Sequence, residues 1–240
     1  MKKLEIPEMD FRLNKIHHTD CLEFMKQVPN NYFDLIVTDP PYKVITGGRN
    51  AGKGQPSGIL AKNKQLMRKI PELSDWLPDV YRILKDNSHV YIMVNLLNLK
   101  EMMEEVEKVG FYIHNLLVWE KANVTPNRWY MKNCEYVIFA KKGRAKQINN
   151  CGSKTVHKFK TNKTTSHPTE KPVELIKFYI GNSISDDGLV FDPFMGSGTT
   201  AIACKNMGIE WCGCELEDDY IEIANKRLEQ VYYFKKGETK

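Results

Sequence analysis

The sequence predicts an α/β domain in which a mostly parallel sheet carries helices on both faces. Short apolar runs alternate with longer segments whose apolar residues recur at helical spacing. Two of the apolar runs pass directly into a carboxylate, at Asp39 and Asp192, which is typical of buried parallel strands that reach one edge of a sheet. The 240 residues are 42% hydrophobic and 27% charged, so one core can form, and we expect a single domain over residues 1–240.

Strands are expected at the short apolar runs. The run at 35–38 is continuously apolar until it meets Asp39, which indicates a strand buried on both faces. The expected strands cover residues 13–17, 35–38, 89–94, 112–121, 135–140, 189–191 and 210–214.

Helices are expected where apolar residues gather on one face at a spacing of three and four. Residues 73–85 show this pattern with Ser74 as the expected N-cap, and residues 100–109 end at Gly110. The other expected helices cover residues 21–27, 172–184, 199–207 and 220–231.

Positive charge is concentrated in two segments. Residues 43–69 hold seven Lys or Arg and no acid, and they are rich in glycine without any period, so we expect a basic mobile loop there. Residues 121–171 hold twelve Lys or Arg against two acids, and residues 141–166 within them form a polar stretch with little periodic signal. Because cationic segments gain affinity for nucleic acids by releasing counterions from phosphates, the two segments favour a polyanionic partner.

The remaining composition limits the compartment and the cofactor class. The six cysteines show no Cys-x-x-Cys spacing, so we expect reduced thiols and no metal site. No run of about 18 apolar residues occurs, and no apolar stretch near Met1 is long enough for a signal peptide. We therefore expect a soluble, cytoplasmic protein with no membrane partner.

The first candidate site is the turn in which Asp39 is followed by Pro40, Pro41 and Tyr42. The prolines fix φ and lack amide donors, so the turn is stiff and rich in acceptors. Asp39 and the Pro40 carbonyl can each accept one N–H of an amino group on a planar base, while the Tyr42 ring stacks on the base. Positioning and electrostatics of this kind activate an amine toward an electrophile. A plain Pro-Pro turn with a capping aspartate is the alternative.

The second candidate site is the glycine turn between Asp192 and Thr199. Gly196 and Gly198 allow close approach of the backbone to a ligand, and free N–H groups at the following helix start favour an anion. A P-loop would need Lys where this chain has Thr199, which disfavours hydrolysis of a nucleoside triphosphate. About twenty residues further on, an apolar run ends at Glu215, where nucleoside-binding sheets place a carboxylate for ribose hydroxyls.

Four motifs in their order resemble those of the amino-methylating DNA methyltransferases of the permuted, β-class order, in which the catalytic motif precedes the cofactor motif. They are Thr-Asp-Pro-Pro-Tyr at 38–42, His-Pro-Thr-Glu-Lys-Pro at 167–172, Asp-Pro-Phe-Met-Gly-Ser-Gly-Thr-Thr at 192–200 and Gly-Cys-Glu-Leu-Glu-Asp-Asp-Tyr at 213–220. The resemblance covers nearly the whole chain. It implies a Rossmann-like methyltransferase sheet with a circularly permuted motif order.

The resemblance implies S-adenosyl-L-methionine as the cofactor, without a metal. It assigns the catalytic role to the turn formed by Asp39, Pro40, Pro41 and Tyr42. The implied cofactor residues are Asp20 beside the adenine ring, Lys171 and Thr199 near the methionine end, Glu215 on the ribose, and Asp192, Phe194, Gly196 and Gly198 along the pocket.

The resemblance also implies double-stranded DNA as the substrate, with the target base flipped out of the duplex. Residues 43–69 would clamp the DNA, and residues 141–166 would recognise the target sequence. Aspartate at position 39 favours adenine N6; cytosine N4, an RNA or protein amine, and an inactive DNA-binding relative are the alternatives. A homodimer and a cognate restriction endonuclease are partners that the resemblance leaves open.

Overall fold

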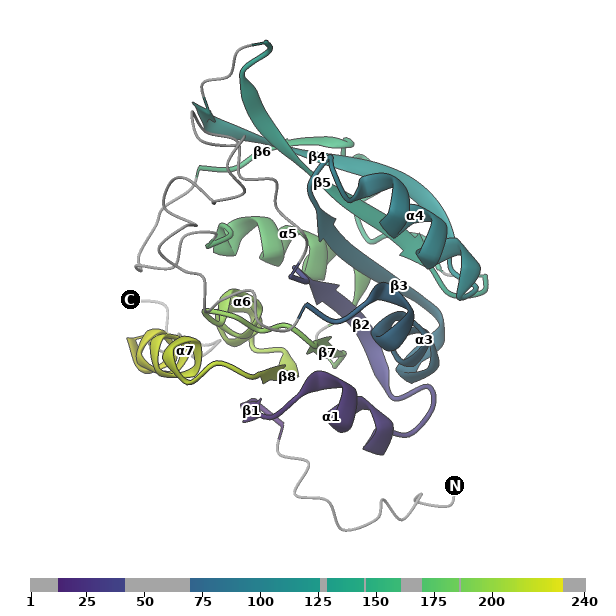
Figure 1. Cartoon of the computed structure of the whole chain (residues 1–240), viewed down its shortest axis with the longest axis vertical. Coiled ribbons are helices and arrows are strands. Elements are labelled where there is room, and N and C mark those ends of the chain that lie inside the picture. Colours follow the sequence, from purple (N-terminus) through teal and green to yellow (C-terminus); the bar gives the residue numbers. More distant parts are fainter. Residues whose placement is uncertain are drawn as a thin grey trace, which may run out of the picture.

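The computed structural model describes residues 13–41, 70–125, 129–144, 146–160, 170–185 and 187–230. Within these residues eight strands form one sheet, in the order β1-β8-β7-β2-β3-β5-β4-β6 (Figure 1). The strands are β1 (Lys15–His18), β2 (Phe33–Thr38), β3 (Leu84–Val94), β4 (Tyr112–Thr125), β5 (Lys132–Lys141), β6 (Val156–Lys158), β7 (Leu189–Asp192) and β8 (Glu210–Glu215). The helices are α1 (Cys21–Gln27), α3 (Leu73–Ile83), α4 (Leu99–Lys108), α5 (Val173–Ser183), α6 (Thr199–Met207) and α7 (Asp218–Gln230).

The sheet is mostly parallel, as the alternation of apolar runs and helical segments predicts. Strands β1, β8, β7, β2 and β3 are parallel to their neighbours along this order. Strand β5 is antiparallel to both β3 and β4, because a short connection after β4 lets the chain fold back as a hairpin. Strand β6 is again parallel to β4.

Helices cover both faces of the sheet (Figure 1). Helices α1, α3 and α4 bury residues such as Phe24, Trp76 and Met102 against one face. Helices α5, α6 and α7 bury residues such as Tyr179 and Ala224 against the other. Side chains of a strand alternate between faces, so each of the central strands contributes to both cores.

Three local features differ from the sequence prediction. Strand β3 begins at Leu84, directly after α3, although residues 84–85 were expected to be helical and the strand to start at residue 89. Ser74 is not the N-cap of α3: the cap is Glu72, whose carbonyl accepts the first N–H of the helix from Asp75 at 3.0 Å, so Ser74 lies inside the first turn. The polar stretch at 141–166 contains a strand, β6, although it has little periodic signal. Only three residues pair there, and so short a strand leaves no alternation to detect.

The chain direction creates a crevice between β2 and β7. From β2 the chain continues to α3 on one face, and from β7 it passes directly to α6 on the opposite face. Ligands of open α/β sheets bind at such a switch point, beyond the carboxyl ends of the strands. Tyr42, the expected loop at 43–69 and the motif residues 167–169 lie outside the described residues. In the part of the chain that is described, no helix has the length and apolar character needed to span a membrane.

Candidate active site

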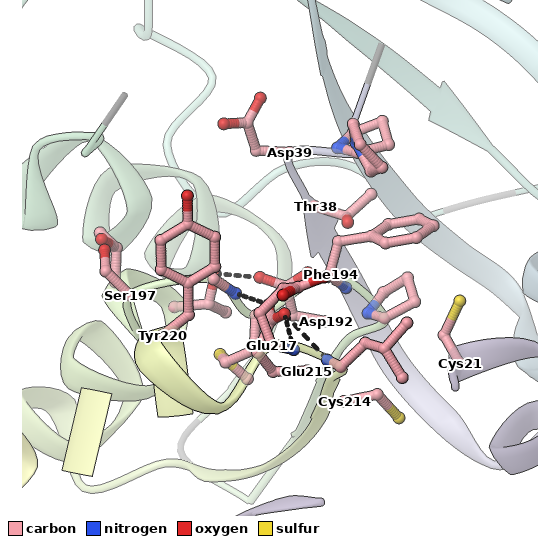
Figure 2. Close-up of a pocket in the computed structure, with 18 of the residues that line it drawn as sticks. Cys21, Thr38, Asp39, Asp192, Phe194, Ser197, Cys214, Glu215, Glu217 and Tyr220 are labelled. Atoms are coloured by element: carbon pink, nitrogen blue, oxygen red, sulfur yellow. Dashed lines mark hydrogen bonds between the residues drawn. The ribbon is translucent and has the colours of Figure 1, made fainter. Parts of the chain in front are cut away.

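A cavity of about 520 Å³ lies at this switch point, beyond the ends of β2, β7 and β8 (Figure 2). Small-molecule sites commonly have roughly 300–1,000 Å³. Most of the residues predicted from the sequence line it, namely Asp20, Asp39, Pro40, Pro41, Lys171, Asp192, Phe194, Gly196, Thr199 and Glu215. The two candidate sites therefore open into the same space.

The carboxyl group of Asp192, the last residue of β7, holds the glycine turn. Its Oδ1 accepts the N–H of Phe194 at 3.0 Å, and its Oδ2 accepts the hydroxyl of Thr200 at 2.6 Å. The side chain is buried, and burial raises the pKa of Asp192 to about 7 despite these bonds. Asp192 thus orders the turn while carrying a proton far more readily than an ordinary aspartate.

Gly198 lies outside the cavity lining and serves the packing of the turn. It caps α6 with a left-handed φ of 82°. A Cβ added to Gly198 would come within 2.8 Å of the Cβ of Ala224 in α7. The glycine therefore lets the turn approach α7 closely, whereas the sequence assigned it to the pocket wall.

Glu215, at the end of β8, faces the glycine turn. Its Oε2 accepts the N–H of Gly196 at 2.7 Å, and its Oε1 accepts the N–H groups of Leu216 and Glu217 at 2.8 and 2.9 Å. Burial raises the pKa of Glu215 above its ordinary value, although these three bonds favour the charged form. A carboxylate has about four acceptor positions, so Glu215 can accept a further bond from a hydroxyl of a ligand.

Asp20 and Tyr220 complete this end of the cavity. Asp20 is the N-cap of α1, where its Oδ1 accepts the N–H of Leu22 at 2.9 Å. Tyr220 belongs to α7 and lines the cavity, and burial raises the pKa of its hydroxyl to about 12 (Figure 2). Tyr220 was given no role from the sequence. It is the last residue of the motif at 213–220, and its place in that motif could have indicated that it lines the same site as Glu215.

Asp39 follows β2 directly and forms an ion pair with Lys171. The Nζ atom of Lys171 lies 2.5 Å from Oδ2 of Asp39 and 3.5 Å from Oε2 of Glu135. Lys171, at 7% side-chain exposure, was expected near the methionine end of a cofactor. The structure brings its ammonium group to the catalytic turn, while Lys171 also lines the shared cavity.

Arg227 in α7 is a site residue that the sequence analysis missed. Its guanidinium group donates to the carbonyl of Ser197 at 2.6 Å and pairs with Oε1 of Glu170 at 2.8 Å, and both partners of this ion pair are buried. Glu170 immediately precedes Lys171 in the chain. Glu170 is linked to the glycine turn through Arg227, and Lys171 pairs directly with Asp39 of the catalytic turn. In the sequence, Arg227 looks like a solvated residue, and its one indication of burial is the i, i+3 spacing from Ala224.

The arrangement suits a cofactor that carries a nucleoside. Asp20 and Glu215 offer acceptors for amine and hydroxyl hydrogens at one end, and Phe194 and Met195 offer an apolar wall for a planar ring. Asp39 stands at the other end with its acceptor-rich turn. Among the described residues, no group of three or more His, Cys, Asp or Glu side chains could hold a metal ion.

The mostly parallel sheet and this shared cavity define a Rossmann-like fold with a site for a nucleoside-containing cofactor. Residues 33–226 match the model of the N6/N4 methyltransferase family, described as a DNA methylase. The chain therefore belongs to this family: it is a DNA methyltransferase that uses S-adenosyl-L-methionine.

Individual relatives agree with this assignment over nearly their whole length. The type II methyltransferase M2.DpnII of Streptococcus pneumoniae is 28% identical over 88% of each chain. M2.MboI of Moraxella bovis is also 28% identical, over 97% of this chain and 94% of its own. The crystal structure of the M1.HpyAVI–SAM complex superposes with a TM-score of 0.68 at 27% identity, covering 89% of this chain and 98% of the other.

Proposed function

We propose that the protein methylates the N6 amine of adenine in double-stranded DNA, acting on a base flipped out of the duplex. The observation that carries this proposal is the shared cavity, in which Asp39 and the residues of the glycine turn line one space. An amine held at Asp39 is thereby placed beside the cofactor cavity. The choice of adenine rests on aspartate at position 39, by the resemblance to adenine-methylating members, and cytosine N4 is the competing outcome.

The catalytic turn can activate the amine without a strong base. Asp39 accepts one hydrogen of the amino group and the Pro40 carbonyl accepts the other, so the nitrogen lone pair is drawn out of the ring system. S-adenosyl-L-methionine supplies an electrophilic methyl group when bound. As the nitrogen bonded to the methyl carbon, the carbon–sulfur bond of the cofactor would break with its electron pair left on sulfur. The nitrogen would become cationic beside Asp39 and afterwards release a proton to solvent. The carboxylate of Asp39 stabilises the positive charge as it develops.

The remaining residues of the cavity would bind the cofactor. In our proposal Glu215 accepts the ribose hydroxyls, Asp20 lies beside the adenine ring, and Asp192 holds the turn against the methionine part. Phe194, Gly196 and Thr199 would contact the cofactor directly, since all three line the cavity. Gly198 would act through packing, and Lys171 through Asp39.

The DNA would lie across the mouth of the cavity. We propose that residues 43–69 clamp it and that residues 141–166 recognise its sequence, within a single domain. The location of β6 supports the second assignment. Strand β6 pairs with β4, and Trp119 of β4 donates its ring N–H to the carbonyl of Phe159 just after β6, at 3.0 Å. Strand β4 also pairs with β5, whose Glu135 lies 3.5 Å from the lysine that contacts Asp39. A homodimer, a cognate restriction endonuclease and a cytoplasmic location remain predictions, the first of which light scattering can test.

The substrate base can be identified directly. Purified protein is incubated with labelled S-adenosyl-L-methionine and unmethylated duplex DNA, and the DNA is digested to nucleosides for mass spectrometry. Label in N6-methyldeoxyadenosine is the expected result. Label in N4-methyldeoxycytidine would contradict the choice of base. No label in DNA, with label in RNA from a parallel incubation, would contradict DNA as the substrate.

The role of Asp39 can be tested in the same assay. Asp39→Asn keeps the shape of the side chain but removes the carboxylate charge, and we expect kcat to fall by about 10²-fold or more. Affinity for S-adenosyl-L-methionine, measured by calorimetry, should change little. Glu229→Gln, the same kind of change on the exposed side of α7, is the control. Near-normal kcat in the Asp39 variant would remove the carboxylate from the mechanism.

A further inference from the structure

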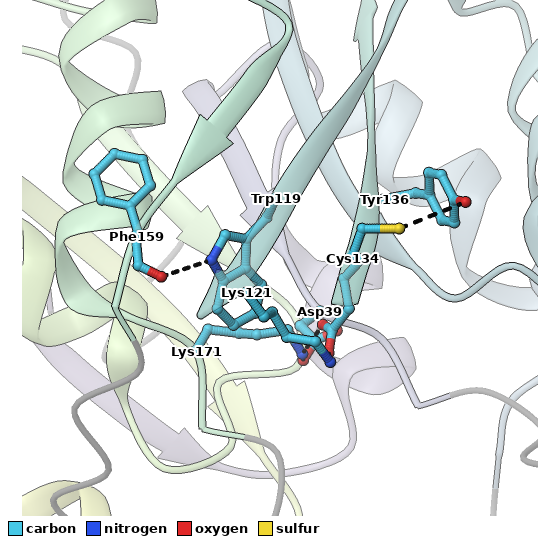
Figure 3. A network of polar contacts seen from close by, with 8 residues as sticks. Asp39, Trp119, Lys121, Cys134, Tyr136, Phe159 and Lys171 are labelled. Carbon is cyan, nitrogen blue, oxygen red and sulfur yellow. Dashed lines mark hydrogen bonds and ion pairs between the residues drawn. The ribbon is translucent and has the colours of Figure 1, made fainter. Parts of the chain in front are cut away.

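Four side chains of alternating charge run from the catalytic turn into the β4–β5 hairpin. Asp39 pairs with Lys171, and Lys171 lies 3.5 Å from Glu135 of β5. Glu135 in turn pairs with Lys121 of β4 at 2.9 Å through its other carboxylate oxygen. Figure 3 shows the side chains of Lys121 and Lys171 converging near Asp39. The four residues come from four separate segments of the chain, and their formal charges sum to zero. We call this set, Asp39, Lys171, Glu135 and Lys121, the charge chain.

The position of Glu135 between two ammonium groups fixes its ionisation. Burial by itself would raise the pKa of Glu135, but Lys171 and Lys121 hold that pKa below its ordinary value. Glu135 therefore stays negative at neutral pH. It is the second carboxylate on Lys171, and it is not itself one of the residues that line the cavity.

The pair of Asp39 with Lys171 alone would suit methyl transfer poorly. Asp39 has to accept a hydrogen from the amine and then face a cationic nitrogen. A buried ammonium group at 2.5 Å opposes both, because it occupies the carboxylate and repels the developing positive charge. A negative group on the far side of Lys171 offsets this repulsion.

We propose that Glu135 is a positioning residue for methyl transfer, which holds the Lys171 ammonium group between two carboxylates and so leaves Asp39 effective toward the amine. Lys121 completes the charge chain and prevents an uncompensated negative charge on the hairpin. The inference rests on the proposed function of Asp39, and it extends the catalytic machinery from the turn after β2 to two residues of the β4–β5 hairpin.

Neutralising single members of the charge chain provides the test. Glu135→Gln leaves a net charge of +1 around Asp39, and we expect kcat to fall by about 10- to 100-fold. This is less than the about 10²–10³-fold found for removal of a group in direct contact with the reacting atoms, because Glu135 acts through Lys171. KM for S-adenosyl-L-methionine should stay within about twofold, because Glu135 does not line the cavity. Lys121→Gln should lower kcat by less than about threefold, since it removes a positive charge further from Asp39.

The double variant Glu135→Gln/Lys171→Gln is the decisive one, because it removes both Glu135 and the ammonium group that Glu135 offsets, and it returns the net charge to zero. We expect it to recover at least about a third of the wild-type kcat, although it has lost more native contacts than Glu135→Gln. A structural role alone predicts the opposite order, with the double variant slowest. Glu135→Asp, which keeps the charge but shortens the side chain, should lie between wild type and Glu135→Gln.

Total methyl transfer to DNA is the readout, so the result does not depend on which base is modified. A wild-type protein without methyl transfer would contradict the proposed function itself. If the wild type is active, a kcat of Glu135→Gln within twofold of the wild-type kcat would overturn the proposed role of Glu135. A double variant no faster than Glu135→Gln would overturn it too.

Glu105→Gln is the matched control. Glu105 is also ion-paired, to Lys108 at 2.9 Å, and has a similar exposure, but it lies on α4 on the other face of the sheet. Thermal unfolding of each variant separates loss of fold from loss of rate, and Glu135→Asp tests the proposal if Glu135→Gln does not fold.

Discussion

The buried carboxyl group of Asp192 should make the stability of the protein fall as the pH rises toward 7. In the unfolded chain its pKa is near 3.8, whereas burial raises it to about 7 in the native state. Between these values the native state holds a proton that the unfolded state has released, so the free energy of unfolding decreases with increasing pH. The difference of about 3 pKa units corresponds to at most about 4 kcal/mol.

Asp192→Asn isolates this contribution, because asparagine has the same shape but does not titrate. We expect the free energy of unfolding of the variant minus that of wild type to increase between about pH 4 and 7, by up to about 4 kcal/mol. Altered hydrogen bonds to Phe194 and Thr200 would displace the curve by a constant amount, so the slope is the informative quantity. Urea denaturation at half-unit steps of pH measures it. Parallel curves for the two proteins would refute the assignment of a raised pKa to Asp192.

Three further substitutions test other parts of the site. Arg227→Met leaves Glu170 buried without its ion-pair partner and should lower the free energy of unfolding by about 3–5 kcal/mol, and combining it with Glu170→Gln should restore part of this loss in urea denaturation. Glu215→Gln should weaken S-adenosyl-L-methionine binding by about tenfold or more in calorimetry, as expected for loss of charged hydrogen bonds, with kcat at saturating cofactor less affected. Gly198→Ala should destabilise by more than Gly208→Ala, because both have a left-handed φ but only the first would meet another residue, and equal melting temperatures would contradict the packing role.

Local patterns in the sequence located both halves of the active site. Asp39 and Asp192 each end a continuously apolar run, and glycines with left-handed φ follow the second, so strand end and turn can be predicted from neighbouring residues alone. The parallel order of the strands then explains why the two halves meet at one edge. The same logic placed Glu215, which ends β8.

Ion pairs between residues far apart in the sequence could not be predicted from such local patterns. Arg227 and Glu135 are charged residues in a helix and a strand, and nothing adjacent to them in the sequence distinguishes them from solvated ones. Their partners lie 57 and 36 positions away, as Glu170 and Lys171, and only the packing of α5 beside the glycine turn and the catalytic turn brings them together. The predicted N-cap of α3 was wrong for a simpler reason. Serine is a common N-cap residue, but the N-cap position lies two residues before Ser74, at Glu72.

The neighbouring positions of Glu170 and Lys171 set a limit on how this enzyme can be given a new target sequence. The segment proposed to recognise DNA precedes these residues, and the chain must return from it so that one side chain meets Arg227 and the next meets Asp39. A recognition segment transplanted from a relative can differ in length and fold, provided that the graft ends before Glu170. A junction placed one residue later would replace Glu170 itself, and with it the buried ion pair to Arg227, whose guanidinium group holds the glycine turn.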